Sequence, residues 1–412
     1  MRQKINVHDW DRRYERTLTR LKQNKLIGES NRQLILRFDE ECRANNLGLP
    51  RRVKYLYTLP ILAERLGKDF NSASVEDIKR VVGRVNDSKY ADWTKNDFRV
   101  ALKRFYRWLR NLPVGQNPPE TAWIRTRSSK NSILPEELLS EDDVSALLRA
   151  CENSRDRAFV ITLYELGGRI GELLSLQRKH VAFDQYGALL MLSGKTGDRR
   201  ARAVLSAPSL SQWLNDHAEK GPEAPLWVCI SDRNKGKPLN YASARMLLRR
   251  LARRAKLRKR VNPQSFRHSR ASLLATKLTE RQMEQYLGWV PGSRMPQVYV
   301  HLSGRDIDNA ILELNGTIEP KITKSGPTLR TKVCVRCEHK NDPISKFCSR
   351  CAMPLDLNAA LEVEEKRRTA DQIMDQLLTD PEVKEFLLAK LIRLKRNQGS
   401  EEGGEVLASS TS

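Results

Sequence analysis

Two arginines, a lysine and a tyrosine form the pattern with the clearest chemistry in this 412-residue chain: they are Arg169, Lys195, Arg267 and Tyr299. The planar arginine side chain can donate two parallel hydrogen bonds to phosphate oxygens. A lysine can supply a proton to a departing oxygen, and a tyrosine hydroxyl can attack phosphorus. The set therefore holds the groups that cleavage of a phosphodiester needs in the absence of a metal ion or ATP.

The four residues lie in four short motifs. Arg169 follows a glycine pair in ELGGRIGELLSL, Lys195 lies in LSGKTGD, and Arg267 lies in QSFRHS. Tyr299 opens the triplet YVH, ten residues after the tryptophan of LGW. These motifs and their order resemble the catalytic domain of the tyrosine recombinases, the phage integrase and Xer-like family. The resemblance covers about residues 140–315, and the basic helical segment ahead of it is similar to that family's core-binding domain.

The resemblance implies DNA strand exchange through a covalent tyrosine. Arg169 and Arg267 match the two family arginines, which stabilise charge on the non-bridging phosphate oxygens. Tyr299 matches the nucleophile, whose attack leaves a 3′-phosphotyrosine and a free 5′ hydroxyl. Lys195, at the tip of an expected hairpin, matches the acid that protonates the leaving oxygen. The phosphotyrosine retains the bond energy, so the exchange needs no cofactor and no external energy source.

Two further positions carry weaker implications. Glu172 stands one helical turn after Arg169 and, by the family pattern, orients that arginine. Trp289 occupies a position where most family members have histidine and some have tryptophan. Its indole N–H can donate to a phosphate oxygen, and its ring can pack against the nucleophile. The simpler alternatives are an exposed helix charge for Glu172 and a bulky core residue for Trp289.

The sequence departs from the family pattern near Arg267. Gln264 stands where the family usually has histidine and sometimes lysine. A glutamine amide can donate to a phosphate oxygen, but it does not exchange protons near neutral pH. More of the acid–base work is therefore expected of Lys195. His268, directly after Arg267, is interpreted as a DNA-contacting or helix-start residue, and a direct catalytic role is the less favoured alternative.

Each residue also has a simpler interpretation when it is taken alone. A lone arginine is usually a surface charge, and a lysine in a turn can merely contact a phosphate. A lone tyrosine is usually a half-buried packing residue. Tyr286 is the nearest competitor of Tyr299 for the nucleophile, but it precedes LGW in a helical run that is expected to be buried. The combination of motifs, and not any single residue, carries the interpretation.

The net charge indicates a polyanionic partner. Lysines and arginines number 74 against 50 aspartates and glutamates, which gives a formal charge of +24 and favours double-stranded DNA. No apolar run approaches the roughly 20 residues that span a bilayer, and the N-terminus does not resemble a signal peptide. We therefore expect a cytoplasmic, DNA-associated protein with no membrane partner. The basic residues expected to contact DNA, besides His268, are Lys95, Arg99, Lys103 and Arg199.

Four of the seven cysteines form two CxxC pairs: Cys334, Cys337, Cys348 and Cys351. This spacing is typical of a tetrahedral four-cysteine zinc site, and it resembles the zinc ribbons. The zinc ion would be structural, because protein ligands fill all four positions. A redox CxxC is the weaker alternative, since no βαβ pattern surrounds the pairs. An added ribbon suggests a recombinase of archaeal type.

The predicted fold is mainly α with a small antiparallel β-sheet. Helical periodicity dominates the chain, and it changes to the periodicity of strands around residues 187–205. The predicted parts are a helical core-binding domain that clamps DNA (1–115), a linker (116–135), the catalytic domain (136–316), a second linker (317–332), the zinc ribbon (333–356), C-terminal helices (357–398) and a disordered tail (399–412).

Together these patterns predict a site-specific DNA recombinase or integrase that acts as a tetramer on two duplexes. Two rivals stay open. A type IB topoisomerase-like enzyme shares the chemistry but lacks strand exchange between sites. A DNA-binding protein of the same fold that has lost catalysis is favoured by one observation, Gln264.

Overall fold

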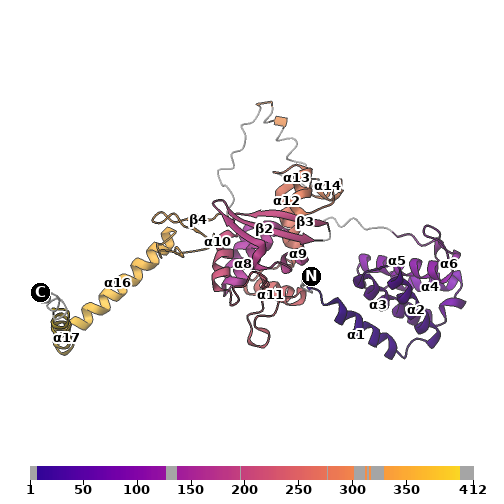
Figure 1. The fold of residues 1–412 in the computed structure, drawn as a ribbon, viewed down its shortest axis with the longest axis horizontal. Helices are drawn as coiled ribbons and strands as arrows, with labels where there is room; N and C mark the ends of the chain where they lie inside the picture. Colours follow the sequence, from indigo (N-terminus) through magenta and orange to yellow (C-terminus); the bar gives the residue numbers. More distant parts are fainter. Residues whose placement is uncertain are drawn as a thin grey trace, which may run out of the picture. The chain divides into compact units, whose positions relative to one another are not determined.

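The computed structural model describes most of the chain, and Figure 1 shows its elements coloured along the sequence. It divides into two compact units, Met1–Gly326 and Pro327–Ser412. Lys195 lies outside the described part, as do residues 400–412 of the predicted tail. The described residues are 7–126, 137–194, 196–275, 277–300, 311–312, 315–316 and 329–399.

The N-terminal part of the first unit is a group of helices around one apolar core. The rings of Phe38, Phe70 and Phe105 pack against one another at its centre. The helix that begins at Val75 starts with a capping box, which Ser74 and Asp77 form. The elements are α1 (Trp10–Gln23), α2 (Glu29–Ala44), α3 (Leu49–Leu66), η1 (Phe70–Ser72), α4 (Val75–Asn86), α5 (Asp92–Leu109) and α6 (Pro119–Ala122).

The rest of the first unit is also mostly helical. Helix α8 is buried on nearly every side, and α7, α10 and α12 pack around it. The helices are α7 (Glu141–Arg149), α8 (Ser154–Leu166), α9 (Ile170–Leu174), η3 (Arg178–His180), α10 (Ala207–Asp216), η4 (Asp232–Asn234), α11 (Tyr241–Arg254), α12 (Pro263–Ala275), α13 (Glu280–Leu287) and α14 (Met295–Val300).

A three-stranded antiparallel sheet completes this part, in the order β1 (Val181–Asp184), β2 (Gly187–Gly194) and β3 (Gly197–Ala203). Alternate side chains of β2 are buried, which is the period of a strand with one covered face. Gly194 pairs with Gly197 at the end of the β2–β3 hairpin, so the predicted hairpin around Lys195 is present. The predicted fold class, mainly helical with a small antiparallel sheet, is confirmed.

The C-terminal unit combines a small cysteine-containing module with two helices. Strands β4 (Lys332–Val333) and β5 (Lys340–Asn341) pair within the module. Helices α16 (Leu357–Thr379) and α17 (Pro381–Gly399) are separated by Asp380, and proline starts the second helix. Among the helices that the structure describes, none is long and apolar enough to cross a membrane.

Candidate active site

Arg169 lies in the turn between α8 and α9, and glycine shapes that turn. Helix α8 ends at Gly167, which adopts a left-handed conformation with φ of 54°. A Cβ atom on Gly167 would lie only 2.9 Å from the Cβ of Arg270 on α12. Glycine is therefore required here because two helices approach closely.

Glu172, one turn along α9, holds the guanidinium group of Arg169. Arg169 Nη1 donates to Glu172 Oε1 at 2.8 Å and to the carbonyl oxygen of Gly288 at 2.7 Å. The Glu172 side chain is 4% exposed, whereas the Arg169 side chain is 35% exposed. Arg169 is thus fixed on its inner side and keeps part of its guanidinium group available to a ligand. The contact is the one that an orienting role for Glu172 requires.

Arg199 of β3 is a second partner of Glu172, which the sequence interpretation did not anticipate. Arg199 Nη2 donates to Glu172 Oε2 at 2.6 Å, and the Arg199 side chain is 11% exposed. Burial lowers the pKa of Arg199, and Glu172 opposes that shift. Arg199 pairs with the buried Leu192 across the hairpin, and directly opposed residues share a face of a sheet. That register was the signal that Arg199 points inward.

Arg267 of α12 is almost fully buried and is held by backbone carbonyl groups. Its Nη1 donates to the Gly167 oxygen and its Nη2 to the Leu287 oxygen, both at 2.9 Å. Its guanidinium group lies 5.4 Å from the centre of the Trp289 ring. Burial, reinforced by the positive charge of Arg169, lowers the pKa of Arg267 to about 10. The group therefore remains a cation at neutral pH.

The β2–β3 hairpin is attached to the turn that follows α13. Thr196 Oγ1 donates to the Gly288 carbonyl oxygen at 2.9 Å, the same oxygen that Arg169 contacts. Gly288 has φ of 66°, and a Cβ atom there would lie 2.5 Å from Arg199 Nε. The turn consequently needs glycine both for its conformation and for its close contact with Arg199. Lys195, the predicted acid, is the residue before Thr196 and is among those the structure leaves undescribed.

Tyr299, the predicted nucleophile, is buried on α14. It is 2% exposed, and its ring stacks on Trp289 with centroids 5.6 Å apart and an interplanar angle of 12°. The Tyr299 hydroxyl oxygen lies 2.6 Å from Nδ1 of His268. Burial raises the pKa of Tyr299 to about 12, against the opposing effect of Arg267. Trp289 thus makes the packing contact with Tyr299 that was one of its two expected functions.

Gln264 joins this group through His268. Gln264 Nε2 lies 3.1 Å from His268 Nε2, so the two ring nitrogens of His268 face Gln264 and Tyr299. The contact arises because α12 begins at Pro263, which places Gln264 and His268 one helical turn apart. The competing tyrosine, Tyr286, instead donates its hydroxyl to a backbone carbonyl oxygen at 3.1 Å.

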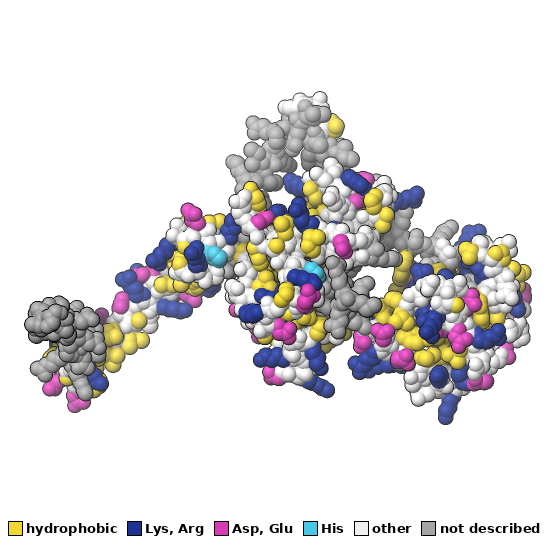
Figure 2. Space-filling view, viewed as in Figure 1, with side chains coloured by type: hydrophobic (Ala, Val, Ile, Leu, Met, Phe, Trp, Pro, Cys, Tyr) yellow, Lys and Arg dark blue, Asp and Glu magenta, His cyan; other side chains and the backbone are white. Residues whose placement is uncertain are grey.

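The basic residues of α5 that were expected to contact DNA make hydrogen bonds to their own domain. Lys95 Nζ donates to the Asn86 carbonyl oxygen at 2.7 Å, and Arg99 Nη2 donates to the Asn86 side chain at 2.6 Å. Lys103 Nζ donates to the Ile124 carbonyl oxygen at 3.0 Å. Figure 2 shows lysine and arginine side chains spread over the helical and catalytic parts. Contact of these three residues with DNA stays a prediction.

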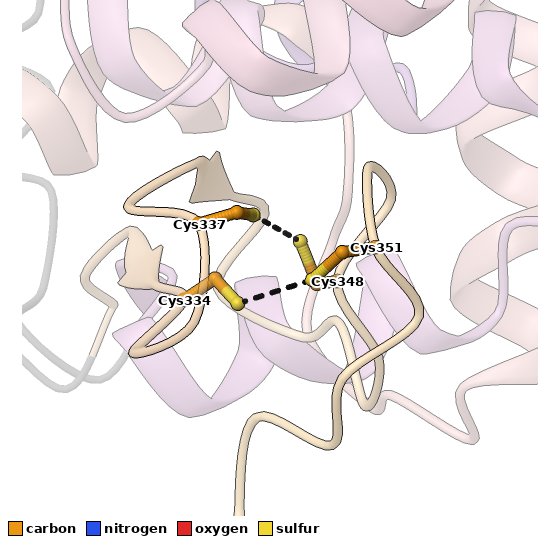
Figure 3. Close-up of side chains that lie close together, drawn as sticks. All are labelled: Cys334, Cys337, Cys348 and Cys351. Carbon is orange, nitrogen blue, oxygen red and sulfur yellow. Dashed lines mark hydrogen bonds between the residues drawn. The ribbon is translucent and has the colours of Figure 1, made fainter.

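The four paired cysteines come together in the C-terminal unit (Figure 3). Their sulfur atoms all lie within 4.8 Å of one another. Cys334 and Cys351 are separated by 3.5 Å, and Cys337 and Cys348 by 3.6 Å, measured between sulfur atoms. A tetrahedron of sulfurs with bonds of about 2.3 Å has edges of about 3.8 Å. The cluster therefore has the size and the donor set to hold one metal ion.

Comparisons with known proteins find a family match over the part of the chain that contains Arg169, Arg267 and Tyr299. Residues 137–305 match the phage integrase family. The tyrosine recombinase XerD of Ralstonia nicotianae is 26% identical over 269 residues, which cover 63% of this chain and 84% of XerD. The tyrosine recombinase XerA of Pyrococcus furiosus is 26% identical over 247 residues, which cover 59% of this chain and 82% of XerA.

Two solved structures show the same fold at low sequence identity. The XerH recombinase bound to difH substrate aligns with a TM-score of 0.51 and 18% identity, covering 79% of this chain and 99% of XerH. A lambda integrase tetramer bound to a Holliday junction aligns with a TM-score of 0.51 and 15% identity, covering 63% of this chain and 77% of the integrase. The chain thus contains a phage integrase family domain over residues 137–305 and is a homologue of the Xer tyrosine recombinases.

Proposed function

We propose that this protein is a site-specific DNA recombinase that cuts and rejoins strands through a covalent bond between Tyr299 and a 3′ phosphate. One observation carries the proposal. Arg267 and Arg169 donate to the consecutive carbonyl groups of Leu287 and Gly288, and the next residue, Trp289, stacks on Tyr299. Two fixed cations and a tyrosine hydroxyl are therefore built around one turn of the chain, as phosphoryl transfer requires.

The residues take the following parts in the reaction. Arg169 and Arg267 bind the non-bridging oxygens and stabilise the charge that develops on them. Tyr299 attacks phosphorus, and Lys195 protonates the departing 5′ oxygen. Attack by the 5′ hydroxyl of a second strand then releases Tyr299 and joins the strands. Because each step exchanges one phosphodiester for another of similar energy, neither ATP nor a metal ion takes part.

We further propose that the protein works in the cytoplasm on two double-stranded DNA sites, as a homotetramer. The formal charge of +24 supports a DNA partner. The XerH and lambda integrase structures were solved with DNA bound, and the latter is a tetramer on a Holliday junction. Pairing of two sites explains how the 5′ hydroxyl of one duplex can attack the phosphotyrosine of another. Trp289 and Gln264 would support Tyr299 and His268 inside the protein.

The cysteine cluster is proposed to hold a structural zinc ion. Four thiolates at tetrahedral spacing are a typical zinc donor set, and they leave no open position for catalysis. The module around them is small, with two strands of two residues each, so the metal would supply much of its folding energy. The XerA relatives are archaeal and the XerD relative is bacterial, so the archaeal type suggested by the ribbon stays a prediction.

A recombination assay tests the proposed function and separates it from its rivals. Duplexes bound by the purified protein are first selected from a random library, which supplies the site. Two linear duplexes of different lengths that carry this site are then incubated with the wild-type protein and with Tyr299→Phe. Recombinant lengths with the wild-type protein alone are expected. Relaxation of supercoiled DNA without recombinants would indicate a topoisomerase, and tight binding without cleavage would indicate a binding protein.

A further inference from the structure

The hydroxyl group of Tyr299 faces a nitrogen base inside the protein. Its oxygen lies 2.6 Å from His268 Nδ1, and the two ring centroids are 5.9 Å apart. The hydroxyl must lose its proton when it attacks phosphorus, since a neutral phenol oxygen is a weak nucleophile. Gln264 occupies the position where the family pattern usually has histidine, and a glutamine side chain cannot take a proton. The proton of Tyr299 therefore needs another acceptor.

Gln264 lies on the far side of the His268 ring. The 3.1 Å separation joins Gln264 to His268 Nε2, while Nδ1 faces Tyr299. The tautomer of a neutral imidazole is set by its two partners, and an amide can present either its oxygen or its nitrogen. In the structure the amide nitrogen of Gln264 faces Nε2, and a half-turn of the amide exchanges its nitrogen and its oxygen. With the oxygen facing the ring, Nε2 carries the ring hydrogen and donates it. Nδ1 then has a free lone pair directed at the Tyr299 hydroxyl.

The electrostatic surroundings favour this neutral form. Burial, and then the positive charge of Arg267, lower the pKa of His268 below its usual value. Among the described groups packed around the ring, Arg267 on α12 is the charged one, Tyr299 on α14 is the titratable one, and Gln264 is neutral. His268 is thus an uncharged acceptor at neutral pH, which is the state that a general base requires.

We propose that His268 is the general base that deprotonates Tyr299, and that Gln264 is the positioning residue that fixes its tautomer. The inference rests on the proposed recombinase function. As the Tyr299 oxygen bonds to phosphorus, the O–H bond breaks and its proton moves to His268 Nδ1. The bond from phosphorus to the 5′ oxygen breaks, and Lys195 protonates that oxygen. In the rejoining step the 5′ hydroxyl gives its proton to the neutral Lys195 amine as its oxygen bonds to phosphorus, and the imidazolium returns its proton to the Tyr299 oxygen as the phosphotyrosine bond breaks.

The alternative function of this contact is inhibitory: a latch that keeps Tyr299 away from its substrate. Tyr299 is 2% exposed, so the hydrogen bond to His268 could hold it away from DNA. The two functions make opposite predictions. Loss of a base slows cleavage, whereas loss of a latch leaves cleavage unchanged or makes it faster.

The test measures single-turnover formation of the covalent DNA adduct on two substrates. One is the selected site with its ordinary 5′ oxygen, and the other carries sulfur in place of that bridging oxygen. A thiolate leaves without protonation, so the sulfur substrate removes the need for an acid and retains the need for a base. The variants are His268→Asn, which keeps a hydrogen-bonding group near the Nδ1 position, His268→Ala, and Lys195→Ala.

If His268 is the general base, the rate of adduct formation should fall about 100-fold or more for both His268 variants on both substrates. Lys195→Ala is expected to be slow with the oxygen substrate and to recover with the sulfur substrate. The proposal is wrong if either His268 variant cleaves the oxygen substrate as fast as the wild type, or recovers with sulfur. DNA binding and thermal melting confirm that each variant is folded. Absence of the adduct in the wild-type protein would instead overturn the proposed function itself.

The pH dependence tests the part played by Gln264. In the wild type, the cleavage rate should fall at low pH as His268 becomes protonated, which gives the pH–rate profile an acidic limb. This limb should disappear in His268→Asn. A carboxylate beside Nε2 stabilises the imidazolium, so Gln264→Glu should shift the limb to higher pH. A limb that stays in place in Gln264→Glu would show that residue 264 does not act through His268.

Discussion

At the scale of single residues, the site depends on a carboxylate that the catalytic scheme never uses directly. Glu172 is 4% exposed and pairs with Arg169 and Arg199. It compensates the charges of two arginines, one partly exposed (Arg169) and one almost buried (Arg199). Removing one partner of a buried ion pair leaves a charge without compensation, and this usually costs about 3–5 kcal/mol.

Glu172→Ala is therefore expected to destabilise the catalytic domain by about 3 kcal/mol and to reduce cleavage. Adding Arg199→Met removes the stranded charge, so the double variant should regain part of the stability and none of the cleavage rate. Calorimetric melting and the adduct assay measure the two quantities. If the double variant were no more stable than Glu172→Ala, Arg199 would not be the partner that matters.

The secondary-structure elements decide whether the predicted residues can meet. The β2–β3 hairpin ends where Gly194 pairs with Gly197, and Thr196 ties that end to the carbonyl oxygen of Gly288. Arg169 donates to the same oxygen, so the hairpin and the start of α9 share one anchor. If Lys195 is the acid, as we propose, its rate contribution should depend on the Thr196 hydroxyl group.

Thr196→Val removes the hydroxyl group and keeps the shape, whereas Thr196→Ser keeps the hydroxyl group. We expect Thr196→Val to reduce cleavage of the ordinary substrate about tenfold, in line with the loss of about one hydrogen bond, and Thr196→Ser to stay near the wild-type rate. The sulfur-leaving substrate should hide most of the defect, because it needs no acid. Equal rates for the two variants would contradict the anchor.

The sequence predicted the fold class and the hairpin, because strong periodicity and glycine turns are local signals. The interpretation of His268 as a helix-start residue is wrong, because α12 begins at Pro263. Proline at the first turn of a helix was the signal that could have found this start. Strand β1 was missed because its four residues are mostly exposed and carry no alternation.

The contacts of the site were less predictable than its residues. Residue types and sequence motifs identified Arg169, Arg267 and Tyr299 as candidate site residues. The pairing of Arg199 with Glu172, however, depends on strand register. The contact of His268 with Tyr299 depends on how α12 packs against α14. The His268 contact arises from tertiary packing, which no local sequence pattern specifies.

At the scale of the whole molecule, the cysteine module and the basic surface can each be tested separately. Wild-type protein is expected to contain about one zinc ion per chain. Cys348→Ser removes a ligand and should lose both the zinc and the melting transition of the module, while Cys229→Ser, outside the cluster, should lose neither. Elemental analysis and calorimetry measure this. Full zinc content in Cys348→Ser would contradict the site.

The basic residues of α5 should contribute to DNA affinity by neutralising phosphates. When a substitution removes one neutralised phosphate from the interface, the slope of log affinity against log salt becomes shallower by about 0.9. Lys95→Ala and Arg99→Ala are expected to show such shallower slopes in fluorescence titrations with duplex DNA. Lys366→Ala serves as the matched control, because it also removes one positive charge but does so on α16, where Lys366 pairs with Glu362. Unchanged slopes for Lys95→Ala and Arg99→Ala would remove α5 from the DNA interface.

The most direct test of the central claim is capture of the covalent intermediate. Protein is incubated with the selected site carrying a nick beside the cleaved phosphate, so that the released fragment diffuses away and rejoining fails. Denaturing gels and peptide mapping then locate the DNA. The account predicts an adduct on Tyr299 that is absent in Tyr299→Phe. An adduct on another residue, or none while DNA binding is intact, would contradict it.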